Sequence, residues 1–251
     1  MADLSVDEYI AAIEREGALM AAAVARGDLD ATVPTCPDWT LRELAHHLGR
    51  VHHWAAAHVE KARPEPLSEG ESEAEWGEMP ADADVISWYR AANARLVATL
   101  RAASTDVQCW SFLPASSPLA FWARRQSHET AIHRADAQGT SGPIDPVPVD
   151  FAVDGIDELL TGFYGRPGRR LRSEKPCTLG VHANDSSWLV HIGPEGPRAE
   201  RGKGAADCTV SGDPNRVYLA LWNRGRLTDL DVAGDPALLD LWTDKATVRW
   251  S

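Results

Sequence analysis

The chain has 251 residues, of which 44% are hydrophobic and 25% are charged, a composition typical of one large globular domain or two small ones. Its formal net charge of -12 repels phosphate backbones, so a nucleic-acid partner is not expected. No apolar run approaches the roughly 18 residues that a membrane-spanning helix needs, so no membrane partner is expected either.

The beginning of the chain and its cysteines favour a cytoplasmic protein. The first residues, MADLSVDEYIAAIER, are acidic and amphipathic and lack the charged and apolar regions of a signal peptide. The four cysteines are scattered and form no CxxC pair. We therefore expect free thiols in a reducing compartment.

Local patterns predict long helices in the first part of the chain. Ser5 with Glu8, and Thr40 with Glu43, have the spacing of capping boxes, and each pair precedes apolar residues at helical spacing. The expected helices cover about residues 5–27, 40–58, 83–103 and 118–138, and the expected loops cover residues 31–40 and 62–84. The second of these loops is acidic and rich in proline, which is typical of a solvated segment.

The second part of the chain has a different pattern. After the linker TSGPIDPVPVD comes a short helix, FAVDGIDELLTGFY. Short alternating runs then predict strands: CTLGVHA, SSWLVHIG, PRAERG and ADCTVSG. NRVYLALWNRG and DPALLDLWTD return to helical spacing. The sequence therefore predicts an α plus α+β architecture, with a helical domain over residues 1–142 and a small α+β domain over residues 149–251.

The neighbouring histidines of the second helix are predicted to point in different directions. Successive helix residues turn by about 100°. The buried stripe of this helix is defined by Leu41, Leu44, Leu48, Val51 and Ala55. His46 falls nearly opposite the stripe, on the face expected to meet solvent, whereas His47 and His52 fall at its two edges. His47 can therefore point into the helical domain and His46 cannot.

The fourth helix carries polar side chains on one narrow face. That face holds Trp122, Gln126, Glu129, His133 and Asp136. His128 lies about 140° from His133 around the helix, and three residues separate Glu129 from His133, so the HExxH pattern of zinc proteases is excluded. The usable pair is Glu129 and His133, which are one turn apart and close enough to hold one small cation.

Two interpretations of this pair are possible. A glutamate and a histidine four residues apart are often a solvated pair on a helix surface. However, Trp122 directs their face towards the core, where a carboxylate and an imidazole without a compensating ion would be costly. With His47 they would form a set of two histidines and one glutamate, which leaves one position open on a catalytic zinc. Asp136 could then accept the other imidazole N–H of His133.

Two segments carry a family resemblance. VPTCPDWTLRELAHHLGRVHHWA has a Pro-Cys-Pro-x-Trp-Thr loop followed by a helix, and RRQSHETAIHRADAQ has a HE-x-x-x-H-R-x-D pattern. They resemble signatures of the mycothiol-dependent maleylpyruvate isomerase family, whose metal domain is a DinB-like four-helix bundle. That family's ligand histidine stands eight residues after the tryptophan, which is His47 here, and its other ligands match Glu129 and His133. The segments VHANDSSWLVHIG and ADCTVSGDPNRVYLALWNRG resemble its sterol-carrier-protein-like C-terminal domain.

The resemblance implies cofactors and a chemistry. It implies a divalent metal, most simply zinc, held by His47, Glu129 and His133, and mycothiol as a thiol cofactor or co-substrate. A thiol at the open metal position would lose its proton at neutral pH and attack a small electrophilic substrate. If the thiolate adds to a cis double bond and then leaves, the product is an isomer; if it stays, the product is an S-conjugate.

The resemblance also suggests a residue that binds substrate. An arginine of the family's C-terminal domain is thought to hold the acidic substrate, and Arg224 stands at the best matching position, next to Arg226. An arginine suits a carboxylate because it can donate two parallel hydrogen bonds. The alternative for Arg224 is a surface arginine that caps a helix just before Gly225. Cys36 follows the family pattern, but its loop between prolines favours a structural thiol.

Two departures from the family pattern leave the substrate open. Ala135 replaces a common aromatic residue, and His46 is an additional histidine beside His47. Within the enzyme hypothesis, an isomerase competes with a thiol S-transferase. The alternative of another class is a non-catalytic module that binds a metal and a small ligand. The chain is expected to be a monomer or a weak homo-oligomer.

Overall fold

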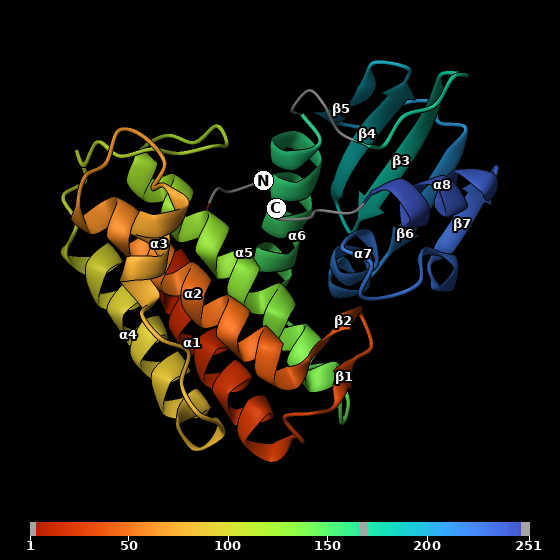
Figure 1. Ribbon diagram of the computed structural model, residues 1–251. Helices are drawn as coiled ribbons and strands as arrows, with labels where there is room; N and C mark the ends of the chain where they lie inside the picture. Colours follow the sequence, from red (N-terminus) through yellow and green to blue (C-terminus); the bar gives the residue numbers. More distant parts are fainter. Residues whose placement is uncertain (1–3, 166–169, 247–251) are drawn as a thin grey trace. The chain divides into compact units, whose positions relative to one another are not determined.

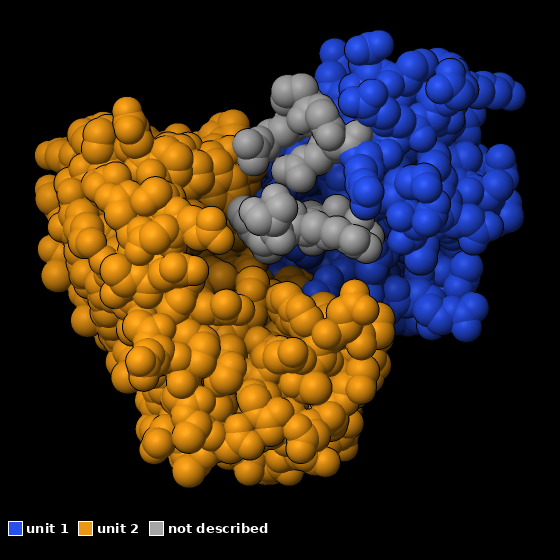
Figure 2. Space-filling model, in the orientation of Figure 1, with its two compact units in different colours: residues 1–3, 146–251 blue, residues 4–145 orange. Residues whose placement is uncertain are grey.

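The computed structural model describes residues 4–165 and 170–246 of the chain (Figure 1). These residues form two compact units, coloured separately in Figure 2. One unit comprises residues 4–145, and the other contains the described residues from Pro146 onwards. Among the described residues, no helix is long and apolar enough to cross a membrane.

The first unit is helical. Its long helices are α1 (Val6–Arg26), α2 (Leu41–Glu60), α4 (Val85–Ala102) and α5 (Pro118–Gly139), and a short 3-10 turn, η1 (Asp82–Asp84), precedes α4. Helix α1 packs against α5 and α4, and α2 packs against α4 and α5. The four helices therefore lie side by side, as Figure 1 shows.

Local capping sets where two of these helices begin. The side chain of Ser5 accepts a hydrogen bond from the backbone N–H of Glu8, whose carboxylate accepts from Ser5 in return. Thr40 and Glu43 do the same at the start of α2. Each box satisfies backbone donors that a helix start leaves unpaired. Both predicted capping boxes are thus confirmed.

The acidic segment 62–84 was predicted to be a loop, and that prediction is wrong. It contains a helix, α3 (Glu69–Trp76), which begins with a third capping box between Ser68 and Glu71. Arg63 also pairs with Glu71, and Glu75 accepts hydrogen bonds from Lys61 of the preceding turn and Arg95 of α4. These contacts stabilise α3, which the low apolar content of the segment does not predict.

The other predicted loop contains a small antiparallel hairpin. Its strands are β1 (Thr32–Val33) and β2 (Cys36–Thr40), and the second strand ends where α2 begins. The backbone N–H of Leu41 donates to the carbonyl of Ala31, which ties the hairpin to the first turn of α2. The hairpin thereby holds Thr35, Cys36 and Trp39 beside the helices.

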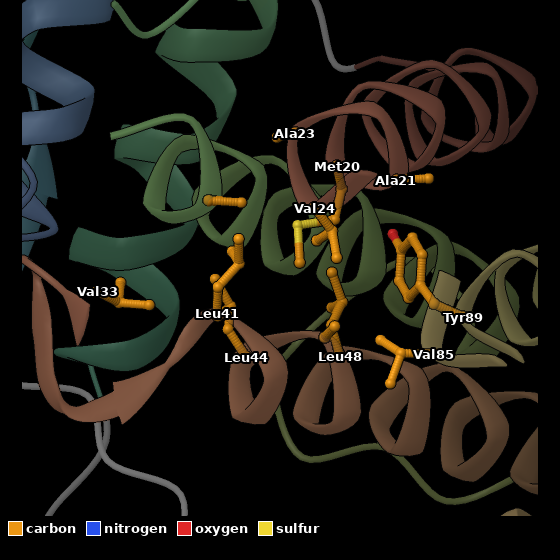
Figure 3. Packing of buried hydrophobic residues seen from close by; sticks show 12 residues of the cluster. Met20, Ala21, Ala23, Val24, Val33, Leu41, Leu44, Leu48, Val85 and Tyr89 are labelled. Atoms are coloured by element: carbon orange, nitrogen blue, oxygen red, sulfur yellow. The ribbon is translucent and has the colours of Figure 1, made fainter. Parts of the chain in front are cut away.

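The core of the helical unit lies where three helices meet. Figure 3 shows Met20 and Val24 of α1 pointing towards Leu48 of α2, with Tyr89 of α4 beside them. Each of these side chains is at most 2% exposed, as is Val33 of the hairpin. Close packing of this kind fixes the positions of α1, α2 and α4 and hence of the polar residues that they carry.

The second unit combines a sheet with helices. Its strands are β3 (Cys177–Ala183), β4 (Ser186–Gly193), β5 (Gly196–Arg201), β6 (Cys208–Gly212) and β7 (Asp231–Gly234). Among the described residues they form one sheet in the order β5-β4-β3-β6-β7, in which only β3 and β6 are parallel. The first four strands are the predicted ones. Strand β7 was not predicted, because all four of its residues are exposed and show no alternation.

The unit also contains helical segments. They are α6 (Val149–Asp157), which continues as a π-helical segment η2 (Glu158–Phe163), then α7 (Pro214–Leu221), the 3-10 turn η3 (Leu227–Asp229) and α8 (Ala237–Lys245). Helix α7 contacts β3 and β6, and η2 contacts β5. Asp157 accepts hydrogen bonds from Trp188 of β4 and from Arg201 of β5. A helical region followed by a sheet domain agrees with the predicted architecture at that level.

Candidate metal centre

Three side chains from two helices meet in the helical unit. One nitrogen of His47, one of His133 and one oxygen of Glu129 all lie within 4.8 Å of one another. Oε1 of Glu129 is 3.4 Å from Nε2 of His47 and 3.2 Å from Nε2 of His133. These are the three residues that the sequence predicted as metal ligands, and the structure brings them together.

The three side chains are mostly buried, and His47 is the most exposed of them. The side chains of Glu129 and His133 are 5% and 9% exposed, whereas that of His47 is 14% exposed. Most residues of α5 are buried, Glu129 and His133 among them. This burial contradicts the alternative of a solvated pair on a helix surface.

Further contacts hold the side chain of His133 in place. Its Nδ1 atom lies 2.9 Å from Oδ2 of Asp136, as predicted. The other carboxylate oxygen of Asp136 accepts a hydrogen bond from the hydroxyl of Thr35 on the hairpin, and the thiol of Cys36 lies 3.9 Å from Oδ2. Cys36 is half-buried, packs against the hydrophobic core and is not one of the three candidate ligands. A structural role for its thiol stays a prediction.

The indole of Trp39 covers two of the histidines. Its ring centroid is 4.6 Å from that of His47 and 6.1 Å from that of His133. The two histidine rings are 5.0 Å apart and nearly perpendicular. Trp39 also packs against the hydrophobic core, so one side chain links the start of α2 to the rims of both imidazoles.

Arg125 is a residue of the site that the sequence analysis missed. It is 1% exposed and donates from Nη2 to Oε2 of Glu129 over 3.2 Å. The signal was present, because Arg125 and Glu129 are four residues apart on one helix, a spacing that brings side chains together. Thr35 was missed as well, and no local pattern relates it to Asp136, which lies 101 positions further on.

Burial and hydrogen bonding oppose each other in this cluster. Burial lowers the pKa of His47. Burial also disfavours the charged form of Glu129, but hydrogen bonds from His133 and His47 outweigh it and hold the pKa of Glu129 well below 4.5. For His133, hydrogen bonds to Asp136 and Glu129 overcome burial and raise the pKa to about 9. Without an ion, a proton on His133 compensates the two buried carboxylates.

The residues present fit a divalent metal ion. Two imidazoles and one carboxylate form the donor set of catalytic zinc sites, which keep a fourth position for water or substrate. Their closest atoms already face one another across the space that an ion would occupy. An ion bound there would take the place of the proton on His133 as the charge that compensates Glu129 and Asp136.

The remaining histidines lie outside the site. The prediction that His46 meets solvent is wrong, because its ring is half-buried and packs edge-on against Trp88 of α4, with centroids 6.0 Å apart. His128 is buried and lies edge-on to Tyr9 of α1. His52 is buried and its Nε2 atom lies 3.0 Å from the hydroxyl of Thr130. Each therefore has a packing contact away from the three candidate ligands.

Arg224 belongs to the other unit. It follows α7 and is half-buried. It donates a hydrogen bond from Nη1 to the carbonyl of Trp222, which is the C-cap residue of α7. This contact matches the interpretation of Arg224 as a helix-capping residue. Arg226, its neighbour, is exposed. A role of Arg224 in binding substrate stays a prediction.

Comparisons with known proteins agree on one family. The N-terminal domain of mycothiol maleylpyruvate isomerase matches residues 10–138, and the C-terminal domain of the same family matches residues 150–241. A search of curated proteins found no match.

Two crystal structures have a similar fold. One is of the mycothiol-dependent maleylpyruvate isomerase, with a TM-score of 0.66, 17% identity, and coverage of 92% of this chain and 94% of that chain. The other is of a variant of that enzyme with a histidine replaced by alanine, with a TM-score of 0.65, 16% identity and the same coverage. On the family matches, the chain belongs to the mycothiol maleylpyruvate isomerase family.

Proposed function

We propose that this protein is an enzyme that uses a divalent metal, most simply zinc, and mycothiol to attack a small electrophilic substrate. The observation that carries the proposal is the convergence of His47, Glu129 and His133, with facing atoms within 4.8 Å of one another, in a chain of this family. The family and the two similar structures support mycothiol as the thiol.

When bound, the metal would supply a positive charge that keeps a coordinated thiol in its reactive thiolate form at neutral pH. The chain's own residues are already arranged to hold this metal. His47 and His133 present Nε2 atoms to the same oxygen of Glu129, and Asp136 fixes the orientation of the His133 ring. Burial of the cluster limits its contact with bulk water, and His47 is the most exposed of the three.

The reaction itself is proposed as either cis-trans isomerisation of a maleylpyruvate-type substrate or transfer of the thiol to an electrophile. The two differ only in whether the thiol leaves after it has added. Arg224 is proposed to bind a carboxylate of the substrate, since its guanidinium can donate two parallel hydrogen bonds. The DinB-like four-helix bundle and the sterol-carrier-like fold, a cytoplasmic location and a monomeric or weakly oligomeric state belong to the same proposal.

The test combines metal analysis with a thiol titration. Purified protein should contain roughly one zinc ion per chain, and addition of mycothiol at neutral pH should release protons. Mass spectrometry of the thiol-loaded protein mixed with a panel of electrophiles would then separate isomers from S-conjugates. Absence of bound metal, or bound metal without thiol binding, would contradict the enzyme and favour a non-catalytic module that binds a metal and a small ligand.

A further inference from the structure

The two oxygens of Glu129 have different partners. Oε1 faces Nε2 of both His47 and His133, at 3.4 Å and 3.2 Å. Oε2 accepts a hydrogen bond from the guanidinium of Arg125, at 3.2 Å. The carboxylate is therefore divided: one oxygen is directed at the candidate metal position, and the other is directed at a cation of the protein.

This division matters for the number of metal ligands. A carboxylate can bind a metal through one oxygen or through both. If Glu129 bound through both, its second oxygen would take the position that a thiol needs. A charge-assisted hydrogen bond from a buried guanidinium opposes that rotation, because the rotation would break the contact between Oε2 of Glu129 and Arg125.

Burial makes the contact more than a surface pair. The side chains of Arg125 and Glu129 are 1% and 5% exposed. A solvated pair four residues apart contributes only about 0.3–0.5 kcal/mol and rearranges readily. In a buried pair each partner has lost its hydration, so the geometry is held much more firmly.

The charge of Arg125 also favours binding of a thiol. A cation beside the cluster repels a bound metal ion and attracts an anion. Arg125 therefore weakens metal binding somewhat and favours an anionic fourth ligand such as a thiolate. A residue that served only to stabilise the helix would have no such opposite effects on two ligands.

We infer that Arg125 is a positioning residue that keeps Glu129 a one-oxygen ligand and so reserves the open metal position for the thiol. This inference rests on the proposed function, since it requires that the three ligands bind a metal and that the metal binds a thiol. Arg125 thereby determines whether the fourth metal position stays open to a thiol or is occupied by the second oxygen of Glu129.

The experiment uses full-length protein loaded with Co²⁺, whose visible absorption reports coordination number. Arg125→Met removes the donor and the charge. Arg124→Met removes the same charge from the neighbouring position of α5 and serves as the control, because Arg124 is half-buried and lies about 140° from Glu129 around the helix. Metal affinity is measured by competition with a chelator, and mycothiol affinity by the thiolate-to-cobalt absorption band.

For Arg125→Met we expect mycothiol affinity to fall about 10–100-fold, the equivalent of one hydrogen bond to a charged group. Metal affinity should be unchanged or tighter, and the weaker visible absorption of the thiol-free protein should indicate an additional ligand. Arg124→Met should resemble the unsubstituted protein in all three measurements. Arg125→Lys, which keeps the charge, should lose less thiol affinity than Arg125→Met.

Other outcomes would overturn the inference. They are an Arg125→Met protein with unchanged thiol affinity, or one that loses metal and thiol affinity in the same proportion, as general damage to the helix would cause. If Arg125→Met does not fold, Arg125→Lys and Arg125→Gln are judged by the same criteria. Failure of the unsubstituted protein to bind metal or mycothiol would instead contradict the proposed function, so the two failures are distinguishable.

Discussion

His133 and Asp136 are joined by a contact of 2.9 Å between Nδ1 and Oδ2, while Nε2 of the same ring faces Glu129. One imidazole thus lies between two carboxylates. Asp136 is itself held by the hydroxyl of Thr35, and turning the ring would break its contact with Asp136. Such partners of ligand histidines fix the ring nitrogen that is offered to a metal.

Asp136→Asn is therefore expected to lower the metal affinity about 10–100-fold, because a neutral amide orients His133 less firmly and makes it a weaker ligand. The measurement is zinc affinity by chelator competition. Asp38→Asn removes the same charge from an exposed position of the hairpin and is the control. Equal effects of the two substitutions would show that Asp136 acts only through its charge at a distance.

His47→Ala and His46→Ala should differ sharply. Removal of a residue that only contacts a metal ligand costs up to about 100-fold in metal affinity. Removal of the ligand His47 itself should therefore reduce zinc affinity by more than about 100-fold. His46 contacts Trp88 and not the three candidate ligands, so its removal should leave zinc affinity close to that of the unsubstituted protein. Similar losses in both variants would contradict the assignment of His47.

Glu16 should be far more important for stability than Glu14. Glu16 pairs with Arg134 of α5 at 2.7 Å, with side chains 1% and 2% exposed, and links α1 to α5. Glu16→Leu would leave a buried guanidinium short of its charge partner and should cost about 3–5 kcal/mol in the free energy of unfolding.

The matched control is Glu14→Leu in the same helix. Glu14 pairs with Arg101, and these side chains are 58% and 52% exposed. Its removal should cost no more than about 1 kcal/mol. Urea unfolding of the two variants measures the difference, and a similar cost for both would show that the buried pair contributes no more to stability than the exposed pair.

His52 should make the protein sensitive to acid. Burial lowers the pKa of His52 from 6.5 to about 3 in the folded state. Between these values the unfolded chain binds a proton at this position and the folded chain does not, so stability falls as pH decreases from about 6.5 towards 3. The hydroxyl of Thr130 donates to the carbonyl of Gln126, so Nε2 of His52 is the protonated nitrogen.

His52→Gln keeps a hydrogen-bond donor for Thr130, but the glutamine side chain does not ionise. Its urea midpoint should fall less steeply than that of the unsubstituted protein between pH 6.5 and about 4, when both are measured with a chelator present. His53 is half-buried and burial lowers its pKa to a smaller extent, so His53→Gln should change the pH profile less than His52→Gln. Parallel pH profiles for the His52 variant and the unsubstituted protein would refute the prediction.

Much of the secondary structure could be predicted because it depends on contacts between residues close in sequence. The capping boxes of Ser5 and Thr40 each join positions three apart, and they begin helices where expected. The same rule applies to Ser68 and Glu71, yet α3 was missed because the surrounding composition suggested a solvated loop. Its helix is stabilised partly by Arg95 of α4, a contact that no local pattern contains.

The candidate site shows the same division. The sequence by itself determined that Glu129, His133 and Asp136 share one face of a helix, since helical geometry alone relates residues three and four apart. A helical wheel also separated His47 from His46, but it wrongly placed His46 in solvent, because a single helix carries no information about α4 packing over that face.

Only the tertiary structure decided which side chains from distant positions meet. The packing of α2 against α5 brings His47 to Glu129, and the hairpin brings Thr35 to Asp136, across 82 and 101 positions of the chain. Such contacts follow from how whole helices pack, which is settled by the shape of the complete core and not by the spacing of residues along one element.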